Sequence, residues 1–285
     1  MSSSAVEKEE APLFLLVDNG SVRPAATLAL RSIANGLSKT TGFEVRPASL
    51  AHSNRIPRED LEGEPAERLI DHLLSPDLAE DRSVVILPFF LGNRGAIVRM
   101  VEKTVAQALS DRPSLKISMA PFLFEEDGED QDVLARAAAS RILDLVNQTT
   151  VPPNVILVDH GSPYPLAAQV RNFVAGQVQA LVRDRVRSVI PASMERREGR
   201  QYQFTEPLLS EVLLRPRLHD RPVILSFFFL LPGRHAGEGG DVAEICAEAR
   251  QKVPSLEILP TALLGDHPIV VEALEKRIRN AASNG

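Results

Sequence analysis

The chain contains one pattern of segments twice, once in each half, and this duplication limits the folds that it can adopt. Four pairs of segments match in the same order, and the difference in residue number between the members of a pair is nearly constant. Residues 13–21 (LFLLVDNGS) match 154–162 (NVILVDHGS), and 113–117 match 254–258, both at an offset of 141 residues. Residues 85–90 match 223–228 at an offset of 138, and Glu64-Pro65 matches Glu206-Pro207 at an offset of 142. Four matches in one order at nearly one spacing predict two lobes of the same fold.

The boundary between the lobes should fall near residues 149–153 (TTVPP), because a polar, proline-rich stretch suits a linker. We therefore predict an N-terminal lobe over residues 12–150 and a C-terminal lobe over 151–285. Residues 1–11 are polar and acidic, which predicts a disordered tail. They lack the basic and apolar regions of a signal peptide.

Within each half, apolar strands alternate with segments of helical periodicity. Strands are predicted at residues 13–17, 43–47, 83–90 and 115–120, then at 155–158, 186–191, 223–230 and 256–259. Helices are predicted at 24–37, 65–74, 96–109 and 133–146, then at 166–182, 207–214, 242–251 and 269–281. Strands that are apolar along their length predict parallel sheets covered on both faces. The fold class is therefore α/β, with two tandem doubly wound lobes, each a small, mostly parallel sheet flanked by helices.

Composition excludes several classes of function. The net charge of −6 does not favour a nucleic-acid surface. The single cysteine, Cys246, excludes an internal disulfide framework and a cysteine-rich metal site. No apolar run approaches the roughly 20 residues needed to cross a bilayer. We expect a cytoplasmic protein with neither a nucleic-acid nor a membrane partner.

Three candidate functional residues each follow a different strand of the second lobe. His160 follows the first strand, Glu195 the second and His235 the third. Because the carboxyl ends of parallel strands share one edge of a sheet, these side chains can converge there. Two imidazoles and a carboxylate with an open position suit a labile divalent ion such as Co²⁺, Fe²⁺ or Ni²⁺. A neutral imidazole can also accept a proton near pH 7.

Each of these interpretations has a simpler alternative. A lone histidine at a strand end is often a hydrogen-bonded structural residue, and Glu195 could belong to a solvated charge cluster with its neighbours. The glycine-rich run at residues 237–240 could be a phosphate-binding nest. It lacks the Lys-Ser/Thr of a P-loop, and no Gly-x-Gly-x-x-Gly follows a first strand, so a nucleotide cofactor is not expected.

Comparison of the two halves favours a shared task for the histidines. The first half has Asn19 where the second has His160, and residues 92–96 (GNRGA) where the second has Gly233-Arg234-His235. Both histidines are absent from the first half, although the strands around them persist. Paired loss fits two residues that serve one site, which leaves the first lobe with a degenerate site.

The segments around these residues resemble the CbiX/SirB-type sirohydrochlorin chelatases, which belong to the class II tetrapyrrole chelatases. The likeness rests on Asp159-His160-Gly161-Ser162, on Ser193-Met194-Glu195 followed by Glu206-Pro207, and on residues 227–235 (FFFLLPGRH) running into Gly240-Asp241. It spans both halves and resembles the two-lobed long form. Shorter members of the family pair two copies as a homodimer, which accounts for the duplication.

This resemblance implies ATP-independent insertion of a divalent metal into sirohydrochlorin or a related tetrapyrrole, in a cleft between the lobes. It assigns the reaction to cobalamin or siroheme biosynthesis. By the family's pattern His160 and His235 hold the metal and accept pyrrole protons, with Glu195 assisting. Groups that could bind the carboxylates of the substrate are Ser162, Arg196, Arg197, Arg200, Arg234 and, from the first lobe, Arg94.

The sequence departs from the family's pattern in two places. The family's Gly-His-Gly-Ser begins here with Asp159, and the first half has Asp18 at the matching position. Residues 196–205 form a longer insertion than the family's pattern predicts. Two further functions stay open, a non-catalytic carrier of tetrapyrrole or metal and a regulatory protein on the same scaffold. A fused two-lobe chain can work as a monomer, and a homodimer is also open.

Overall fold

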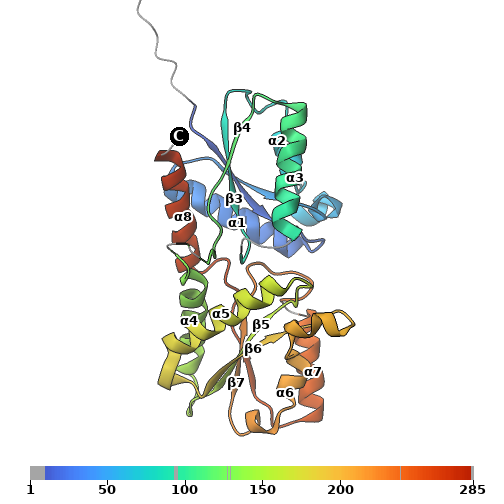
Figure 1. The fold of residues 1–285 in the computed structure, drawn as a ribbon, viewed down its shortest axis with the longest axis vertical. Coiled ribbons are helices and arrows are strands. Elements are labelled where there is room, and N and C mark those ends of the chain that lie inside the picture. Colours follow the sequence, from blue (N-terminus) through green and yellow to red (C-terminus); the bar gives the residue numbers. More distant parts are fainter. Residues whose placement is uncertain (1–9, 93–95, 127, 129, 238, 284–285) are drawn as a thin grey trace, which may run out of the picture.

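The computed structural model describes residues 10–92, 96–126, 128, 130–237 and 239–283. It contains two four-stranded parallel sheets, one in each lobe, as the sequence predicts (Figure 1). The first has the order β2-β1-β3-β4, with β1 (Leu13–Asp18), β2 (Val45–Ser49), β3 (Ser83–Pro88) and β4 (Lys116–Met119). The second has the order β6-β5-β7-β8, with β5 (Asn154–Asp159), β6 (Ser188–Ser193), β7 (Val223–Phe227) and β8 (Ile258–Pro260).

Eight α-helices flank the two sheets in the described part of the chain. They are α1 (Pro24–Thr41), α2 (Leu69–Leu73), α3 (Ala96–Asp111), α4 (Val133–Val146), α5 (Pro165–Val182), α6 (Leu209–Leu213), α7 (Asp241–Lys252) and α8 (Pro268–Ser283). The helices predicted at 65–74 and 207–214 are shorter than expected, because the residues before them are extended. The amide of Ser49 donates to the carbonyl of Glu67, and that of Ser193 to the carbonyl of Pro207.

The central strands β1 and β5 are buried over all six residues, which explains why they read as uninterrupted apolar runs. Strand pairing and backbone hydrogen bonds correct two of the residue offsets between the repeats. Leu13 pairs with Val84 and Asn154 with Val223, so the offset between the third strands is 139 rather than 138. The carbonyl of Pro207 accepts from Ser193 as the carbonyl of Glu67 accepts from Ser49, so Pro207 corresponds to Glu67. Glu206-Pro207 is therefore not the structural counterpart of Glu64-Pro65.

The two lobes exchange their last helices (Figure 1). Helix α4 ends the first half of the chain but packs against α5 and β7 of the second lobe. Helix α8 ends the second half but packs against α1 and β3 of the first. On α8, Arg277 donates to the backbone carbonyls of Pro121 and Phe122, at 3.1 and 2.9 Å. The boundary at residue 150 stays a prediction about repeated segments, whereas in space each sheet is covered by a helix from the other half.

Because of this exchange, one hydrophobic core extends through both lobes. It includes Phe14 of β1, Leu157 of β5, Ile142 of α4 and Leu274 of α8, all fully buried. The lobes are thus held in a fixed relation, and the carboxyl ends of their sheets face each other. In the described part of the chain, no helix has both the length and the apolar character needed to cross a membrane.

Candidate functional site

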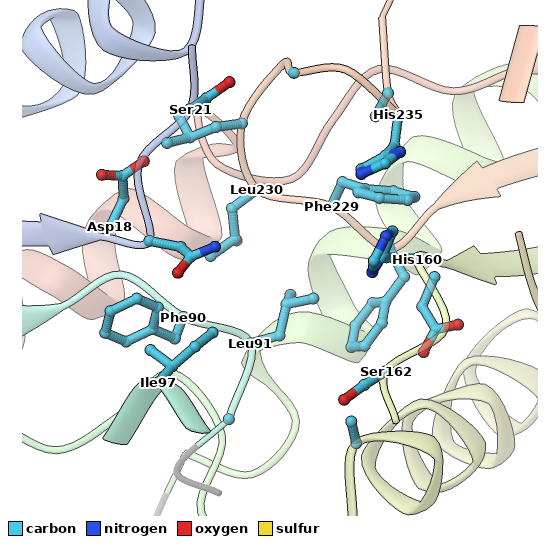
Figure 2. Close-up of a pocket in the computed structure, with 18 of the residues that line it drawn as sticks. Asp18, Ser21, Phe90, Leu91, Ile97, His160, Ser162, Phe229, Leu230 and His235 are labelled. Carbon is cyan, nitrogen blue, oxygen red and sulfur yellow. The ribbon is translucent and has the colours of Figure 1, made fainter. Parts of the chain in front are cut away.

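A cleft of about 510 Å³ lies between the lobes, at the carboxyl ends of both sheets. The loops after β1, β3, β5 and β7 line it, together with the first turns of α3 and α5. Figure 2 shows His160 and His235 on one side of this cleft and Phe90, Leu91 and Ile97 on the other. Both imidazoles come from the second lobe, whereas the first lobe supplies Phe90, Leu91 and Ile97.

His160 enters this cleft because β5 ends one residue before it. The amide of Met194 donates to the carbonyl of Asp159 at 2.8 Å, and the amide of Glu195 donates to the carbonyl of His160 at 3.3 Å. These two hydrogen bonds fasten the loop after β6 to the loop after β5. As a result Oε1 of Glu195 lies 3.2 Å from Nε2 of His160.

The structure also brings the two histidines together, with ring centroids 4.2 Å apart and ring planes inclined by 40°. A metal ion about 2.1 Å from an imidazole nitrogen and from a carboxylate oxygen can bridge the 3.2 Å between His160 and Glu195. Among the described residues, no three histidine, cysteine or acidic side chains already form a metal-binding cluster. The cleft therefore presents two imidazoles and an adjacent carboxylate, donors that could hold a divalent cation.

His235 is oriented by a residue to which the sequence analysis gave no role. Nδ1 of His235 lies 2.7 Å from Oδ2 of Asp241, at the first position of α7. A carboxylate on Nδ1 fixes the tautomer and leaves Nε2 as the nitrogen with a free lone pair. The sequence carries a weak indication of this contact, since Asp241 begins the helix that directly follows the histidine loop.

The pKa of His160 lies below the ordinary histidine value of 6.5. The main cause is the low-dielectric wall of the cleft, and the neighbouring His235 adds to it, while Glu195 and Asp159 oppose the shift. The side chain remains 45% exposed, so a ligand in the cleft can reach it. At neutral pH His160 is therefore an uncharged imidazole that can hold a cation or accept a proton.

The comparisons with known proteins agree with this geometry. Residues 154–281, which contain both histidines and Glu195, match the model of the CbiX family. The second lobe is therefore similar to the CbiX/SirB-type chelatases. The chloroplastic sirohydrochlorin ferrochelatase of Arabidopsis thaliana is 27% identical over 133 residues, which are 46% of this chain and 53% of the relative. The match thus spans about half the length of that curated relative.

Solved structures show that the whole chain has the chelatase-like fold. SirB from Bacillus subtilis, solved with Fe³⁺, has a TM-score of 0.67 at 17% identity and covers 96% of this chain and 97% of its own. CbiX, described as the terminal enzyme of siroheme biosynthesis in denitrifying bacteria, has a TM-score of 0.60 at 16% identity over 95% of this chain and 99% of its own. A multi-domain protein of Deinococcus radiodurans with similarity to chelatases has a TM-score of 0.59 at 16% identity over 94% of this chain and 55% of its own.

Some of the residues predicted to bind substrate line the cleft, and others do not. Ser162 and Arg234 line it. The other three arginines of the second lobe, Arg196, Arg197 and Arg200, are not among its lining residues. The insertion folds into a 3₁₀ turn at Arg200–Thr205, beside an ion pair of 3.0 Å between Arg196 and Glu206, so a role of these arginines in binding substrate stays a prediction. Arg94 lies outside the described residues.

The first lobe lacks the functional groups at every equivalent position. The amide of Ala51 donates to the carbonyl of Asn19 at 3.2 Å, as Glu195 does to His160, so Ala51 replaces the glutamate. With the offset of 139 residues found for the third strands, the first-lobe residue equivalent to His235 is Ala96. Both histidines and Glu195 therefore belong to the second lobe alone, and the first lobe supplies the facing wall.

A glycine holds the loops of the histidine and the glutamate close together. Gly161 has φ of +94°, and a Cβ atom there would overlap the carbonyl oxygen of Glu195. We expect Gly161→Ala to lower the free energy of unfolding by at least about 2 kcal/mol. It should also weaken Co²⁺ binding, because Glu195 must move away from His160. Thermal unfolding and a Co²⁺ titration measure the two effects.

The first lobe provides the matched control. Gly20 has φ of +86°, and a Cβ atom there would overlap the carbonyl oxygen of Ala51. Gly20→Ala should therefore cost similar stability without weakening Co²⁺ binding. Equal losses of Co²⁺ affinity in both variants would contradict a specific role for the Gly161 turn.

Proposed function

We propose that this chain is a chelatase that inserts a divalent metal into sirohydrochlorin or a related tetrapyrrole. The observation that carries the proposal is the pair of imidazoles, 4.2 Å apart, on one wall of an interlobe cleft of about 510 Å³. The opposite wall, with Phe90, Leu91 and Ile97, offers an apolar face against which a flat macrocycle can pack. We propose no nucleotide, because the reaction needs bases and a held ion rather than phosphoryl transfer.

The reaction exchanges two pyrrole N–H protons for one divalent ion. In the proposed mechanism, His160 and His235 first hold the ion through neutral imidazole nitrogens. As the ion passes to the pyrrole nitrogens, the two imidazole lone pairs become free, and each can accept one of the displaced protons. Glu195 stabilises the resulting imidazolium of His160 from 3.2 Å, and Asp241 stabilises that of His235 from 2.7 Å.

The nature of the ligands supports Co²⁺, Fe²⁺ or Ni²⁺ as the substrate ion, because imidazole and carboxylate accept all three. We place the reaction in siroheme or cobalamin biosynthesis, and the protein in the cytoplasm. Siroheme is favoured because the Arabidopsis relative is a sirohydrochlorin ferrochelatase and the similar CbiX is the terminal enzyme of siroheme biosynthesis. The cleft holds residues of both lobes in one chain, which supports a monomer as the active species.

An absorbance assay with purified chain, sirohydrochlorin and each ion in turn tests this function. We expect multiple turnovers without ATP, seen as the shift of the macrocycle absorption when metal enters it. A carrier on the same scaffold would instead bind metal and tetrapyrrole stoichiometrically. The product formed without protein is subtracted first. If the remaining product never exceeds the molar amount of protein, the protein is a carrier and the chelatase proposal is wrong.

A further inference from the structure

Arg171 of α5 is the largest fully buried side chain of the described residues, and it lies directly behind the histidine site. Its Nη1 atom donates to three oxygens: the carboxylate of Asp159 at 3.3 Å, the hydroxyl of Ser193 and the backbone carbonyl of Thr205 at 2.9 Å. Asp159 precedes His160, and Ser193 stands two residues before Glu195. One guanidinium thus joins the two strand ends that carry the functional side chains.

The third contact fixes the far end of the insertion. Thr205 is buried and ends the 3₁₀ turn through which the chain returns after Glu195. The hydroxyl of Ser193 also donates to Asp159 at 2.7 Å, so Arg171, Asp159 and Ser193 form one buried network. The segment between Glu195 and Thr205 is therefore anchored at both ends to the same network.

The first lobe shows what this network adds. Asp18 and Ser49 repeat the aspartate–serine pair, with 2.6 Å between the hydroxyl and the carboxylate. The position of Arg171 is taken there by Leu30, since each is the seventh residue of its helix, counted from Pro24 in α1 and from Pro165 in α5. Leu30 is equally buried. The fold thus accepts a leucine at this position, and the arginine occurs only in the lobe that has the two histidines.

Holding the loop after the second strand does not by itself require this arginine. In the first lobe Arg31 performs that task from the surface side, donating to the carbonyls of Leu61, Glu64 and Pro65 at 3.0, 2.9 and 2.9 Å. Arg31 makes no hydrogen bond to Asp18 or Ser49 among the described contacts. What distinguishes Arg171 is its link from the loop to the strand ends.

Stability alone also does not explain a buried arginine here. Removing two charges from water costs about as much as their attraction returns, so a buried ion pair adds little net stability over apolar packing. In addition, Nη2 of Arg171 has no hydrogen-bond partner in the described part of the protein. An apolar residue such as that of the first lobe would therefore serve the core equally well.

We propose that Arg171 is a positioning residue of the metal site, which holds the His160 and Glu195 loops at the separation that one ion can bridge. This inference rests on the proposed function, because it takes His160 and Glu195 as groups that meet the ion. Arg171 itself does not touch the cleft, since it is absent from the lining residues. Its effect passes through Asp159 and Ser193 to the residues that follow them.

The test is a Co²⁺ titration of the free protein, followed through the d–d absorption of the bound ion. Arg171→Leu recreates the arrangement of the first lobe, so the protein should fold and unfold in one cooperative transition. We expect its Co²⁺ affinity to fall about 10-fold or more, the usual cost of losing a group that orients metal ligands. Arg31→Leu, which removes the loop-holding arginine of the other lobe, should bind Co²⁺ as the wild type does.

A double variant separates positioning from unpaired charge. In Asp159→Asn with Arg171→Leu no buried charge is left alone, yet Ser193 and Thr205 still lack their donor. We expect this variant to bind Co²⁺ as weakly as Arg171→Leu. Recovery of wild-type affinity in the double variant, unchanged affinity in Arg171→Leu, or an equal loss in Arg31→Leu would each overturn the inference. A wild-type chain that binds no Co²⁺ would overturn the proposed function as well, whereas normal wild-type binding confines a failure to Arg171.

Discussion

Replacing both His160 and His235 by alanine should reduce metal insertion to the uncatalysed rate, a loss of about 10³-fold or more. The double variant keeps the cleft and its apolar wall but removes both nitrogens that hold the ion and both bases that accept its displaced protons. Each single variant should lose nearly as much as the pair, because the two imidazoles act on one ion. Initial rates with sirohydrochlorin and Co²⁺, corrected for the reaction without protein, measure the effect.

A histidine outside the cleft provides the control for this result. His219 belongs to the same lobe, and its Nε2 atom lies 3.1 Å from the carbonyl of Leu213, away from the cleft lining. His219→Ala should change the rate by less than about threefold. A double variant of His160 and His235 that retained wild-type turnover would exclude the chelatase mechanism.

The second large effect concerns stability, and it follows from Asp18. This carboxyl is buried at the first-lobe wall and forms no ion pair with any of the described residues, and burial raises its pKa from 3.8 to about 6 despite the hydrogen bond from Ser49. A carboxyl that is harder to ionise in the folded state destabilises the fold once it ionises. The difference corresponds to about 3 kcal/mol at neutral pH and disappears below about pH 4, where Asp18 is protonated in both states.

Asp18→Asn should therefore stabilise the protein at pH 7. Asparagine still accepts the hydrogen bond of Ser49 but offers one acceptor fewer, which costs about 1 kcal/mol, so a net gain of about 2 kcal/mol is expected. The gain should grow as the pH rises from about 4 to 6 and stay constant above that. Urea unfolding at several pH values measures it.

The equivalent change in the second lobe should act in the opposite direction. Burial raises the pKa of Asp159 too, but Arg171 and Ser193 act against this shift, and the carboxylate is the counter-charge of a fully buried guanidinium. Asp159→Asn leaves that guanidinium unpaired and should cost about 3 kcal/mol or more. If both variants shifted stability in the same direction, the role assigned to the Asp159–Arg171 pair would be wrong.

The sequence predicted the sheets and the meeting of His160, Glu195 and His235 because both follow from local pattern. Apolar runs mark buried parallel strands, and residues directly after such strands collect at one edge of the sheet. The exchange of α4 and α8 could not be predicted in this way. Periodicity tells which face of a helix is apolar, but not which of two similar sheets that face will cover.

Charged residues were the least predictable part of the site. Arg196 was expected to bind substrate carboxylates at the rim, and its ion pair with Glu206 within the insertion could not be predicted from the sequence. Arg171 sits in the middle of a helix, where an arginine normally points to water, and nothing in its neighbours marks it as buried. Its place becomes visible only when α5 is laid beside the ends of β5 and β6.

The exchange of helices also governs the order in which the protein can be completed during synthesis. When the first half of the chain has been made, the first sheet still lacks α8, and the apolar face of α4 still lacks the second sheet. The missing cover for both arrives with the second half of the chain, and for the first sheet only with Pro268–Ser283. The first repeat therefore reaches its native core only after α8 has been made, although it carries the pattern of a complete lobe.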